Sequence, residues 1–264
     1  MSEEFYQSDL TDKQWEAIEP MLPPVHRIGR PRLYSRRRLI AAILYLIKSG
    51  CQWRMIPKDM PHWQSCYRYF STLKKDGTWL RIHERLRERI RLQEGRKRAP
   101  TAAIIDSQSV KSAGHSGVRG YDAGKKINGR KRHILVDTLG LVLLSKVHEA
   151  SIQDRDGARL LLKSLEKAFG WISLIWADGG YAGILVGWVR GIQRHRKIKL
   201  EIVKRSDHAK GFEVLPWRWV VERTFGWLVQ QRRLARDYET TISSAEAMIN
   251  IAMIRLMLGR IAEK

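Results

Sequence analysis

The spacing of apolar residues changes near residue 95, and this change limits the folds that the chain can adopt. Before it, apolar residues recur every three or four positions, as they do along one face of a helix. After it, short apolar runs alternate with helical stretches, as in a sheet covered by helices. The 264 residues are enough for two modest domains. We therefore predict an all-helical domain over residues 1–95 and an α/β domain over 96–264.

Helix signals are dense in the first domain. Thr11 and Gln14 form a capping box before a short helix, and Ser35 can cap a longer helix that ends at Gly50. A further helix, basic and aromatic, is expected over about 62–75. Short helices joined by tight turns form a helix-turn-helix pattern, which is typical of DNA-binding domains but is shared by other small helical bundles.

The second domain begins after a linker at residues 94–100. Short apolar runs of the kind found in buried strands then follow one another, and two of them, joined by Thr-Leu-Gly, predict a β-hairpin. Helical stretches separate the later runs, so the order indicates a mixed sheet with flanking helices. The predicted strands are 101–106, 133–137, 141–147, 173–178 and 199–205.

Two helices of the second domain have candidate caps. Asp154 or Asp156 could begin the helix that follows the hairpin. Ser243 and Glu246 form a capping box before a long apolar helix.

The net charge points to a polyanionic partner. The chain has 49 Lys and Arg against 27 Asp and Glu, a formal charge of +22. Such a charge favours nucleic acid, although a charged surface can also serve solubility alone. No apolar run approaches the ~20 residues of a membrane span, and the acidic N-terminus is unlike a signal peptide. We therefore expect a soluble intracellular protein that binds nucleic acid.

Three carboxylates are candidates for chemistry in this basic chain. Asp106 ends one predicted strand and Asp178 ends another, where a rigid side chain can meet a ligand beside a loop. Each could instead cap a turn, which is the reading we prefer for Asp137. Glu222 lies on a predicted helix one turn after Arg218, so the two could form either part of a site or a surface ion pair.

Transfer of a phosphodiester gives a reason for three carboxylates. Such reactions use two hard cations about 3.5–4 Å apart, one at the attacking oxygen and one at the leaving oxygen. Magnesium prefers oxygen ligands and keeps several waters, so a few Asp and Glu side chains suffice.

Several sequence motifs resemble those of a known family. The segments IIDSQSVKS, KRHILVDTLGLVL, QDRDGA, WADGGYAG and RWVVERTFGWL are similar to segments of the DDE transposases of bacterial insertion sequences, and of the insertion-sequence five family in particular. The N-terminal segments LTDKQWEAIEPMLP, GRPR and SGCQWRMIP extend the resemblance over nearly the whole chain.

The resemblance implies a ribonuclease-H-like catalytic domain and a metal-dependent transposase. The family's two Asp and its Glu fall on Asp106, Asp178 and Glu222, which would be both catalytic and metal-binding. The expected cofactor is Mg²⁺, with Mn²⁺ as a substitute, and two ions. The expected partners are the DNA of the element's ends and of the target. We also expect a homo-oligomer on DNA and a cytoplasmic, nucleoid-associated location.

Two functions other than transposition are compatible with these residues. A nuclease of the same fold would cut DNA without joining it to a target. A catalytically inactive DNA-binding regulator would only bind.

The chain departs from the family pattern near Glu222. Leu215 stands where the family has Tyr, three residues before Arg218, and Gln230 stands where close relatives have a basic residue. Arg233 is expected on the same helical face and could replace that residue. These departures leave two questions open: whether Arg218 and Arg233 contact the DNA end as DNA-binding residues, and whether this copy is active.

Four arginines near the N-terminus are further candidate DNA contacts. Arg30 and Arg32 lie in Gly-Arg-Pro-Arg, which is similar to an arm that enters a minor groove but also suits a solvated linker. Arg36 and Arg37 could contact phosphates or form the solvent side of a helix.

A glycine-rich basic stretch, residues 107–132, is expected as a loop. It ends in Lys131 and Arg132, and it could order over a DNA backbone or remain a mobile surface loop. His133 follows, with either a catalytic role or a hydrogen-bonded structural role. The chain has only two cysteines and no compact zinc-binding spacing, so no zinc is expected.

Overall fold

The computed structural model describes residues 6–24, 32–114, 117–192, 197–203 and 217–262. The chain divides into two compact units. The first, called the helical unit here, comprises Met1–Gln93, Leu228–Ala235 and Ala247–Lys264. The second, called the sheet unit, comprises Glu94–Trp227 and Arg236–Glu246. The first boundary lies close to residue 95, but two later segments that the sequence had placed with the catalytic domain are packed with the N-terminal helices.

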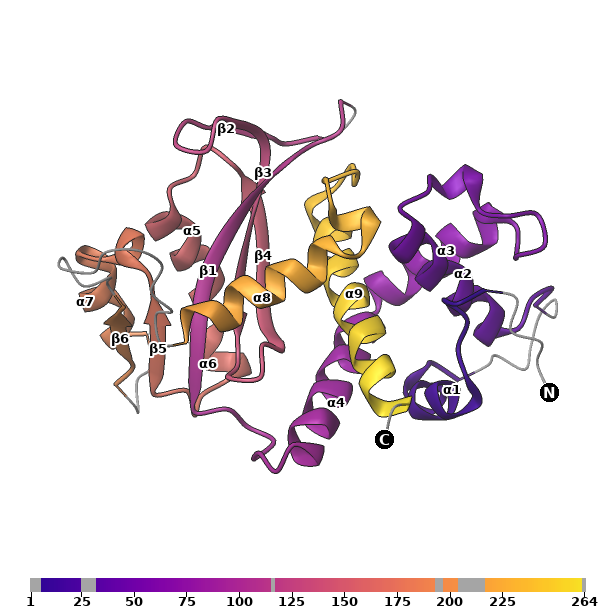
Figure 1. The fold of residues 1–264 in the computed structure, drawn as a ribbon, viewed down its shortest axis with the longest axis horizontal. Coiled ribbons are helices and arrows are strands. Elements are labelled where there is room, and N and C mark those ends of the chain that lie inside the picture. The colour runs from indigo at the N-terminus through magenta and orange to yellow at the C-terminus, as the bar shows by residue number, and fades with distance from the viewer. Residues whose placement is uncertain (1–5, 25–31, 115–116, 193–196, 204–216, 263–264) are drawn as a thin grey trace. The chain divides into compact units, whose positions relative to one another are not determined.

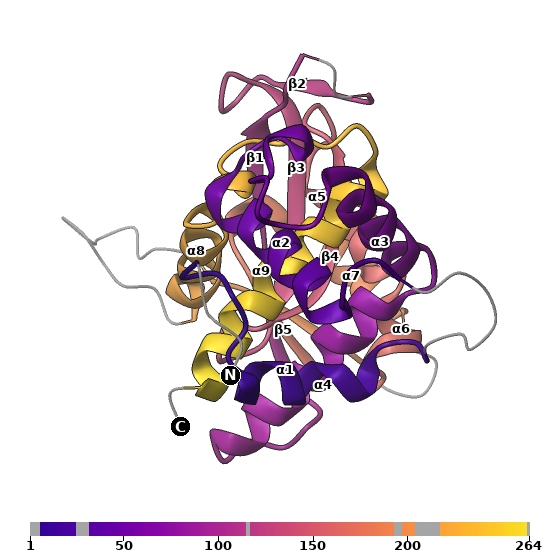
Figure 2. The same cartoon turned by 90° about the vertical axis from the view of Figure 1, so that its right-hand side faces the viewer.

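The helical unit begins with four α-helices whose ends follow the sequence signals. Thr11 and Gln14 make both bonds of the capping box, and Ser35 Oγ accepts a hydrogen bond from Arg38 N. Gly50 ends the second helix with a φ of 73°, which a side chain would strain. These helices are α1 (Asp12–Ile18), α2 (Arg36–Ser49), α3 (Trp63–Lys75) and α4 (Thr78–Gln93), and α2 packs against α3 (Figures 1 and 2).

The core of the helical unit combines distant parts of the chain. Ile40, Ile43 and Ile47 form the buried stripe of α2 that the sequence predicts. The later part of α9 (Ile242–Ala262) is also buried, and Gln14 Nε2 donates a hydrogen bond to Leu258 O at 3.3 Å. The apolar face of the N-terminal helices is therefore completed by residues more than 200 positions away.

The long helix α9 corrects one expectation. Its residues Ile242–Ile261 are long and apolar enough to cross a membrane, whereas the sequence was expected to contain no such stretch. Of this stretch, 61% is buried inside the protein, as in the core helix of a globular fold.

The sheet unit contains a six-stranded mixed sheet in the described residues. Its central path is β2 (Gly120–Asp122), β3 (Ile127–Val136), β1 (Ala102–Lys111), β5 (Leu174–Ala177) and β6 (Lys199–Ile202). β4 (Val142–Glu149) pairs with β3. The first four strands are joined antiparallel, while β1–β5 and β5–β6 are parallel (Figure 1). This arrangement confirms the ribonuclease-H-like fold that was expected.

Helices and a 3₁₀ turn complete the sheet unit. They are α5 (Asp154–Leu162), α6 (Leu165–Ala168), α7 (Ile184–Arg190), α8 (Arg218–Val229) and the 3₁₀ helix Gly179–Tyr181. The core between α5, α7 and the sheet contains Ile105, Leu135, Leu162 and Ile175. Burial of these side chains holds the strand that carries Asp106 in a fixed position.

The stretch 107–132 is largely strand, and not the loop that was expected. β1 continues through Lys111, and β3 begins at Ile127. All eight residues from Ile104 to Lys111 are paired with β3 residues, so the ladder hydrogen bonds support a strand segment that lacks an apolar run.

Both predicted caps of the second domain are also wrong. Gln153 is the N-cap of α5, and Asp154 bonds elsewhere. The N-terminal turn of α9 is bonded by Thr241 Oγ1, which accepts from Ser244 N. Glu246 accepts from Val147 N, in β4.

Candidate active site

Asp106 and Asp178 lie at the same level of two neighbouring strands. The parallel register of β1 and β5 pairs Ala102 with Leu174 and Ile104 with Trp176. Continuing it by two residues brings Asp106 beside Asp178, the residue directly after β5. Because side chains two residues apart on a strand point to the same face, both carboxylates leave the sheet on one side. The sequence predicted that Asp106 ends its strand, whereas the structure places Asp106 within β1. Asp178 directly follows β5, which agrees with its predicted position at a strand end.

The electrostatic environment of Asp106 is that of a partly buried acid beside another acid. Burial, together with the Asp178 carboxylate, raises its pKa to about 6, although a bond from Ser107 N at 2.7 Å opposes the change. The Lys125 and Arg218 cations also oppose it. Asp178 is better solvated, and its Oδ1 accepts from Gly180 N at 2.8 Å, which caps the following 3₁₀ turn.

Arg218 connects this pair to Glu222. Its Nη2 lies 4.0 Å from Asp178 Oδ2 and 3.4 Å from Glu222 Oε1. The Glu222 side chain is 59% exposed, so its carboxylate faces solvent. The predicted neighbourhood of Arg218 and Glu222 on one helical face is confirmed. The Arg218–Glu222 contact by itself is a partly exposed ion pair of the kind worth little in stability.

The position of α8 depends on contacts with the β3–β4 turn. Thr224 Oγ1 donates to Gly140 O at 2.8 Å, and Arg223 Nη2 donates to Leu139 O at 3.2 Å. The Arg223 guanidinium also lies over the rings of Trp219 and Trp227, at 4.5 and 4.6 Å. These contacts fix the helix that presents Arg218 and Glu222 to the sheet unit.

The carboxylate pair suits a divalent cation. Carboxylate oxygens are ligands that Mg²⁺ prefers, and a cation between Asp106 and Asp178 would offset the burial and the carboxylate repulsion that raise the Asp106 pKa. No three His, Cys, Asp or Glu side chains come together as a metal site among the described residues. Glu222 stands apart from the pair, joined to it through Arg218.

A buried polar network lies directly behind Asp106. Ser107 Oγ donates to Asp154 Oδ1 at 2.8 Å, and Lys131 Nζ lies 3.0 Å from the same oxygen. His133 Nδ1 is 2.8 Å from His148 Nε2, and His133 Nε2 is 4.0 Å from Asp154 Oδ1. Burial lowers the pKa of both histidines, so the pair is neutral near pH 7.

This network gives His133 a hydrogen-bonded structural position. The sequence did not assign Asp154 or His148 to the vicinity of the site. The only sequence signal was the QDRDGA motif, whose glycine, Gly157, packs directly against both histidines.

The other predicted DNA contacts are distributed over both units. Lys131 and Arg132 are buried in β3, where Lys131 meets Asp154 and Arg132 Nη2 donates to Arg236 O at 3.2 Å. Arg36 bonds Glu19 and Pro23 O, each at 3.0 Å, and Arg37 pairs with Asp12. These four side chains thus have partners within the protein.

Arg32 remains exposed, with its guanidinium 5.4 Å from the Tyr69 ring centre. Arg30 and Leu215 lie outside the described residues. Arg233 is not on the helical face of Glu222, because α8 ends at Val229 and Arg233 belongs to a 3₁₀ helix. Arg233 Nη1 donates to Cys51 O at 2.9 Å, and Gln230 is exposed just after α8.

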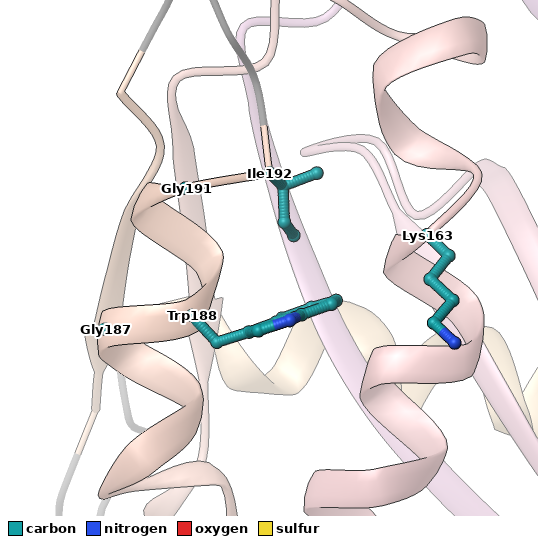
Figure 3. Close-up of a pocket in the computed structure, with 5 residues that line it drawn as sticks. All are labelled: Lys163, Gly187, Trp188, Gly191 and Ile192. Atoms are coloured by element: carbon teal, nitrogen blue, oxygen red, sulfur yellow. The ribbon is translucent and has the colours of Figure 1, made fainter.

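A pocket of about 450 Å³ lies elsewhere in the sheet unit. Lys163, Gly187, Trp188, Gly191 and Ile192 line it, with the flat face of the Trp188 ring beneath Ile192 and Lys163 opposite (Figure 3). None of the candidate catalytic residues lines this pocket.

Comparisons with known proteins match transposase families in both units. Residues 97–257 match the family model described as the transposase DDE domain, a range that contains Asp106, Asp178 and Glu222. Residues 10–83 match a family model of transposases of the IS4/5 family. An uncharacterized 16.2 kDa protein of insertion element IS402 from Burkholderia cepacia is 32% identical over 111 residues. The match covers 40% of this chain and 74% of that protein.

Proposed function

The chain belongs to the DDE transposases of the IS4/5 type, and from this premise we propose that it binds the terminal inverted repeats of its insertion sequence, cuts the DNA there and transfers the cut strand to a target. The single observation that supports the chemistry best is the convergence of Asp106 and Asp178 from parallel strands beside Arg218 and Glu222. This arrangement supports the proposal because carboxylates, the ligands that Mg²⁺ prefers, lie beside a guanidinium that could bind a phosphate.

The three carboxylates would hold divalent cations, most simply two Mg²⁺ with Mn²⁺ as a substitute. When bound, these ions supply charge stabilisation for the attacking and leaving oxygens of a phosphodiester. Asp106 and Asp178 would form the rigid part of the ligand set, because Asp106 lies within β1 and Asp178 directly follows β5, the strand that pairs with it. Glu222 completes the set from α8 once Arg218 turns from the carboxylates to DNA.

Arg218 is the residue that would place the scissile phosphate. A guanidinium can donate two parallel hydrogen bonds to one phosphate, which an ammonium cannot. In the DNA-free protein it is attracted by Asp178 and Glu222 and is only partly exposed. When DNA binds, a phosphate would replace the two carboxylates as the partner of Arg218, and cations would replace Arg218 as the partner of the carboxylates. Arg218 would therefore be available for phosphate when the carboxylates hold metal.

The reaction itself needs no covalent link to the protein. Water attacks the phosphorus at the element end and breaks its bond to the 3′-oxygen, which leaves a 3′-hydroxyl on one strand piece and a 5′-phosphate on the other. That hydroxyl then attacks a target phosphorus in line and displaces the 3′-oxygen of the target strand, which leaves as a 3′-hydroxyl. We place recognition of the ends in the N-terminal helices, and we expect a homo-oligomer on DNA and a cytoplasmic location. A net charge of +22 favours DNA as a partner and makes DNA binding depend on the salt concentration.

The test uses the full chain and a duplex that ends in the inverted repeats flanking its gene. Incubation with Mg²⁺ should cut the repeat boundary, and precut ends should join to a target plasmid. Cutting without joining would identify a nuclease. Specific binding without cutting in either Mg²⁺ or Mn²⁺ would identify an inactive regulator and overturn the proposed chemistry.

A further inference from the structure

The outer face of α3 carries a set of side chains suited to reading bases. The exposed or half-exposed positions recur at helical spacing, while Cys66, Tyr69, Phe70 and Leu73 face the core. All the outward side chains can form hydrogen bonds, and none is acidic. The exposed ones are Gln64, Tyr67, Arg68, Thr72 and Lys75, and the half-exposed ones are Trp63, Ser65, Ser71 and Lys74.

The neighbouring helix α4 shows what a purely solvated face looks like in this protein. Its outward positions mix arginine with glutamate and also include the exposed Leu80 and Leu92, and Arg85 Nη1 lies 3.5 Å from Glu88 Oε2. In contrast, α3 contains no Asp or Glu at all. The side chains of Gln64 and Arg68 have no hydrogen-bond or ion-pair partner within the described part of the chain. Solubility does not require a helix without acidic residues, whereas binding to a polyanion such as DNA favours one.

The N-terminal half of α3 is held firmly by aromatic contacts. His62 Nδ1 accepts from Gln64 N at 3.4 Å and begins the helix. The Arg54 guanidinium lies 5.1 Å from the Trp63 ring centre, and the Trp53 and Tyr67 rings meet edge to face at 5.2 Å. A rigid helix that presents free polar side chains loses little entropy when it binds.

We infer that the outer face of α3 enters the major groove of the element's end and that Gln64 and Arg68 read base edges there. The inference rests on the proposed function, since it assigns the surface that recognises the DNA. Helices that enter the major groove commonly contact bases through their N-terminal residues. Here α3 presents Gln64 and Arg68 in its N-terminal half, and residues 50–62, which include a 3₁₀ helix, separate it from α2. Arginine suits the two acceptors of guanine, and glutamine suits adenine. Lys75, at the other end of the face, suits a phosphate.

The experiment measures binding of the full chain to its terminal repeat and to a scrambled duplex of equal length, in Ca²⁺ and at fixed salt. Arg68→Ala and Gln64→Ala should each weaken binding to the repeat about 10- to 100-fold, the usual effect of one lost bidentate base contact. Binding to the scrambled duplex should change less than about threefold, because phosphate contacts dominate non-specific affinity. The matched control is Arg85→Ala on α4, which removes the same charge and should leave the preference for the repeat intact.

Three outcomes separate this inference from the function on which it rests. Loss of preference in Arg68→Ala and Gln64→Ala, but not in Arg85→Ala, supports the reading face. Preference unchanged in both α3 variants overturns it while the transposase proposal stands. Absence of any preference in the unmodified chain overturns end recognition itself. Circular dichroism of each variant verifies that α3 is intact, and a misfolded alanine variant is replaced by Arg68→Lys, which should reduce preference with the fold preserved.

Discussion

Asp106 and Asp178 are brought together by a strand register and not by a loop. Every pairing between β1 and β5 joins residues 72 positions apart, and the two aspartates lie two residues beyond the last pair, Ile104 with Trp176, at the same spacing. The backbone hydrogen bonds of the sheet therefore hold the two strands from which these side chains project. Such a site has little freedom to adjust, which suits a reaction that depends on the placement of two oxygens and a phosphorus.

Arg218→Lys tests the positioning role of the arginine between the carboxylates. We expect cleavage and strand transfer to slow by roughly 10²-fold, because an error of about 1 Å in placement can cost that much. Thermal stability should stay the same, since the Arg218–Glu222 pair is partly exposed. Single-turnover cleavage and thermal unfolding are measured on the same variant. The control is Arg159→Lys, at a surface pair with Asp156, which should cleave normally. Normal cleavage by Arg218→Lys would contradict the positioning role of Arg218.

Gly157→Ala should destabilise the sheet unit. An added Cβ would lie 2.5 Å from His148 Nε2 and 2.7 Å from His133 Nδ1, so the buried pair must move. Overpacking of this kind costs about 1–3 kcal/mol, which exceeds the gain of about 1 kcal/mol from replacing a helical glycine by alanine. Chemical unfolding provides the measurement. Gly187→Ala in α7 has no neighbour within 4 Å and should be neutral or stabilising; equal effects of the two changes would contradict the packing.

Arg130→Met should be among the most damaging substitutions in the chain. The Arg130 side chain is fully buried, lies 3.3 Å from Asp237 Oδ1, and donates to Glu239 O at 2.7 Å and Thr240 O at 3.0 Å. Removing one partner of a buried pair costs about 3–5 kcal/mol, because the remaining charge loses its counterpart. The free energy of unfolding is compared with that of Lys199→Ala, which breaks an exposed pair and should change it by less than about 1 kcal/mol.

His83→Leu should stabilise the helical unit, more so in acid. Both ring nitrogens of His83 are buried without a hydrogen-bond partner among the described residues, and burial lowers its pKa to about 3. Unfolding exposes an ordinary histidine that binds a proton below about pH 6.5, so stability is lost as pH falls from there toward 3. Replacing the unsatisfied ring should add about 1–3 kcal/mol at pH 7. Thermal unfolding from pH 7 to 5 should show a flatter profile for the variant than for the original chain.

The sequence predicted elements whose signals are local. The Thr11 capping box, the Ser35 cap and the glycine stop at Gly50 each need only a few neighbouring residues, and all three are confirmed. Lys131 and Arg132 were placed in a loop because the predicted strand begins only at residue 133 and the residues before it are polar. Their strand exists through pairing with β1, and their charges are balanced by residues such as Asp154, which are distant in the sequence.

Local signals made the candidate residues visible in the sequence, although the family resemblance was needed to choose them over their structural alternatives. Asp178 follows an apolar strand, and Arg218 and Glu222 share a helical face, so each was visible in a short segment. The support behind Asp106 was not visible. His133, His148 and Asp154 meet only after β3, β4 and α5 pack together, and no short pattern marks that meeting.

The most direct test of the central claim is metal-dependent cleavage of terminal-repeat DNA by the three amide variants. Asp106→Asn, Asp178→Asn and Glu222→Gln keep the shape of each side chain but weaken metal ligation. Each should abolish cleavage in Mg²⁺ while binding to the repeat in Ca²⁺ stays within about threefold of the original, since the ion-holding groups do not read the DNA. Cleavage at the original rate by all three variants would contradict the assignment of these carboxylates as the catalytic site.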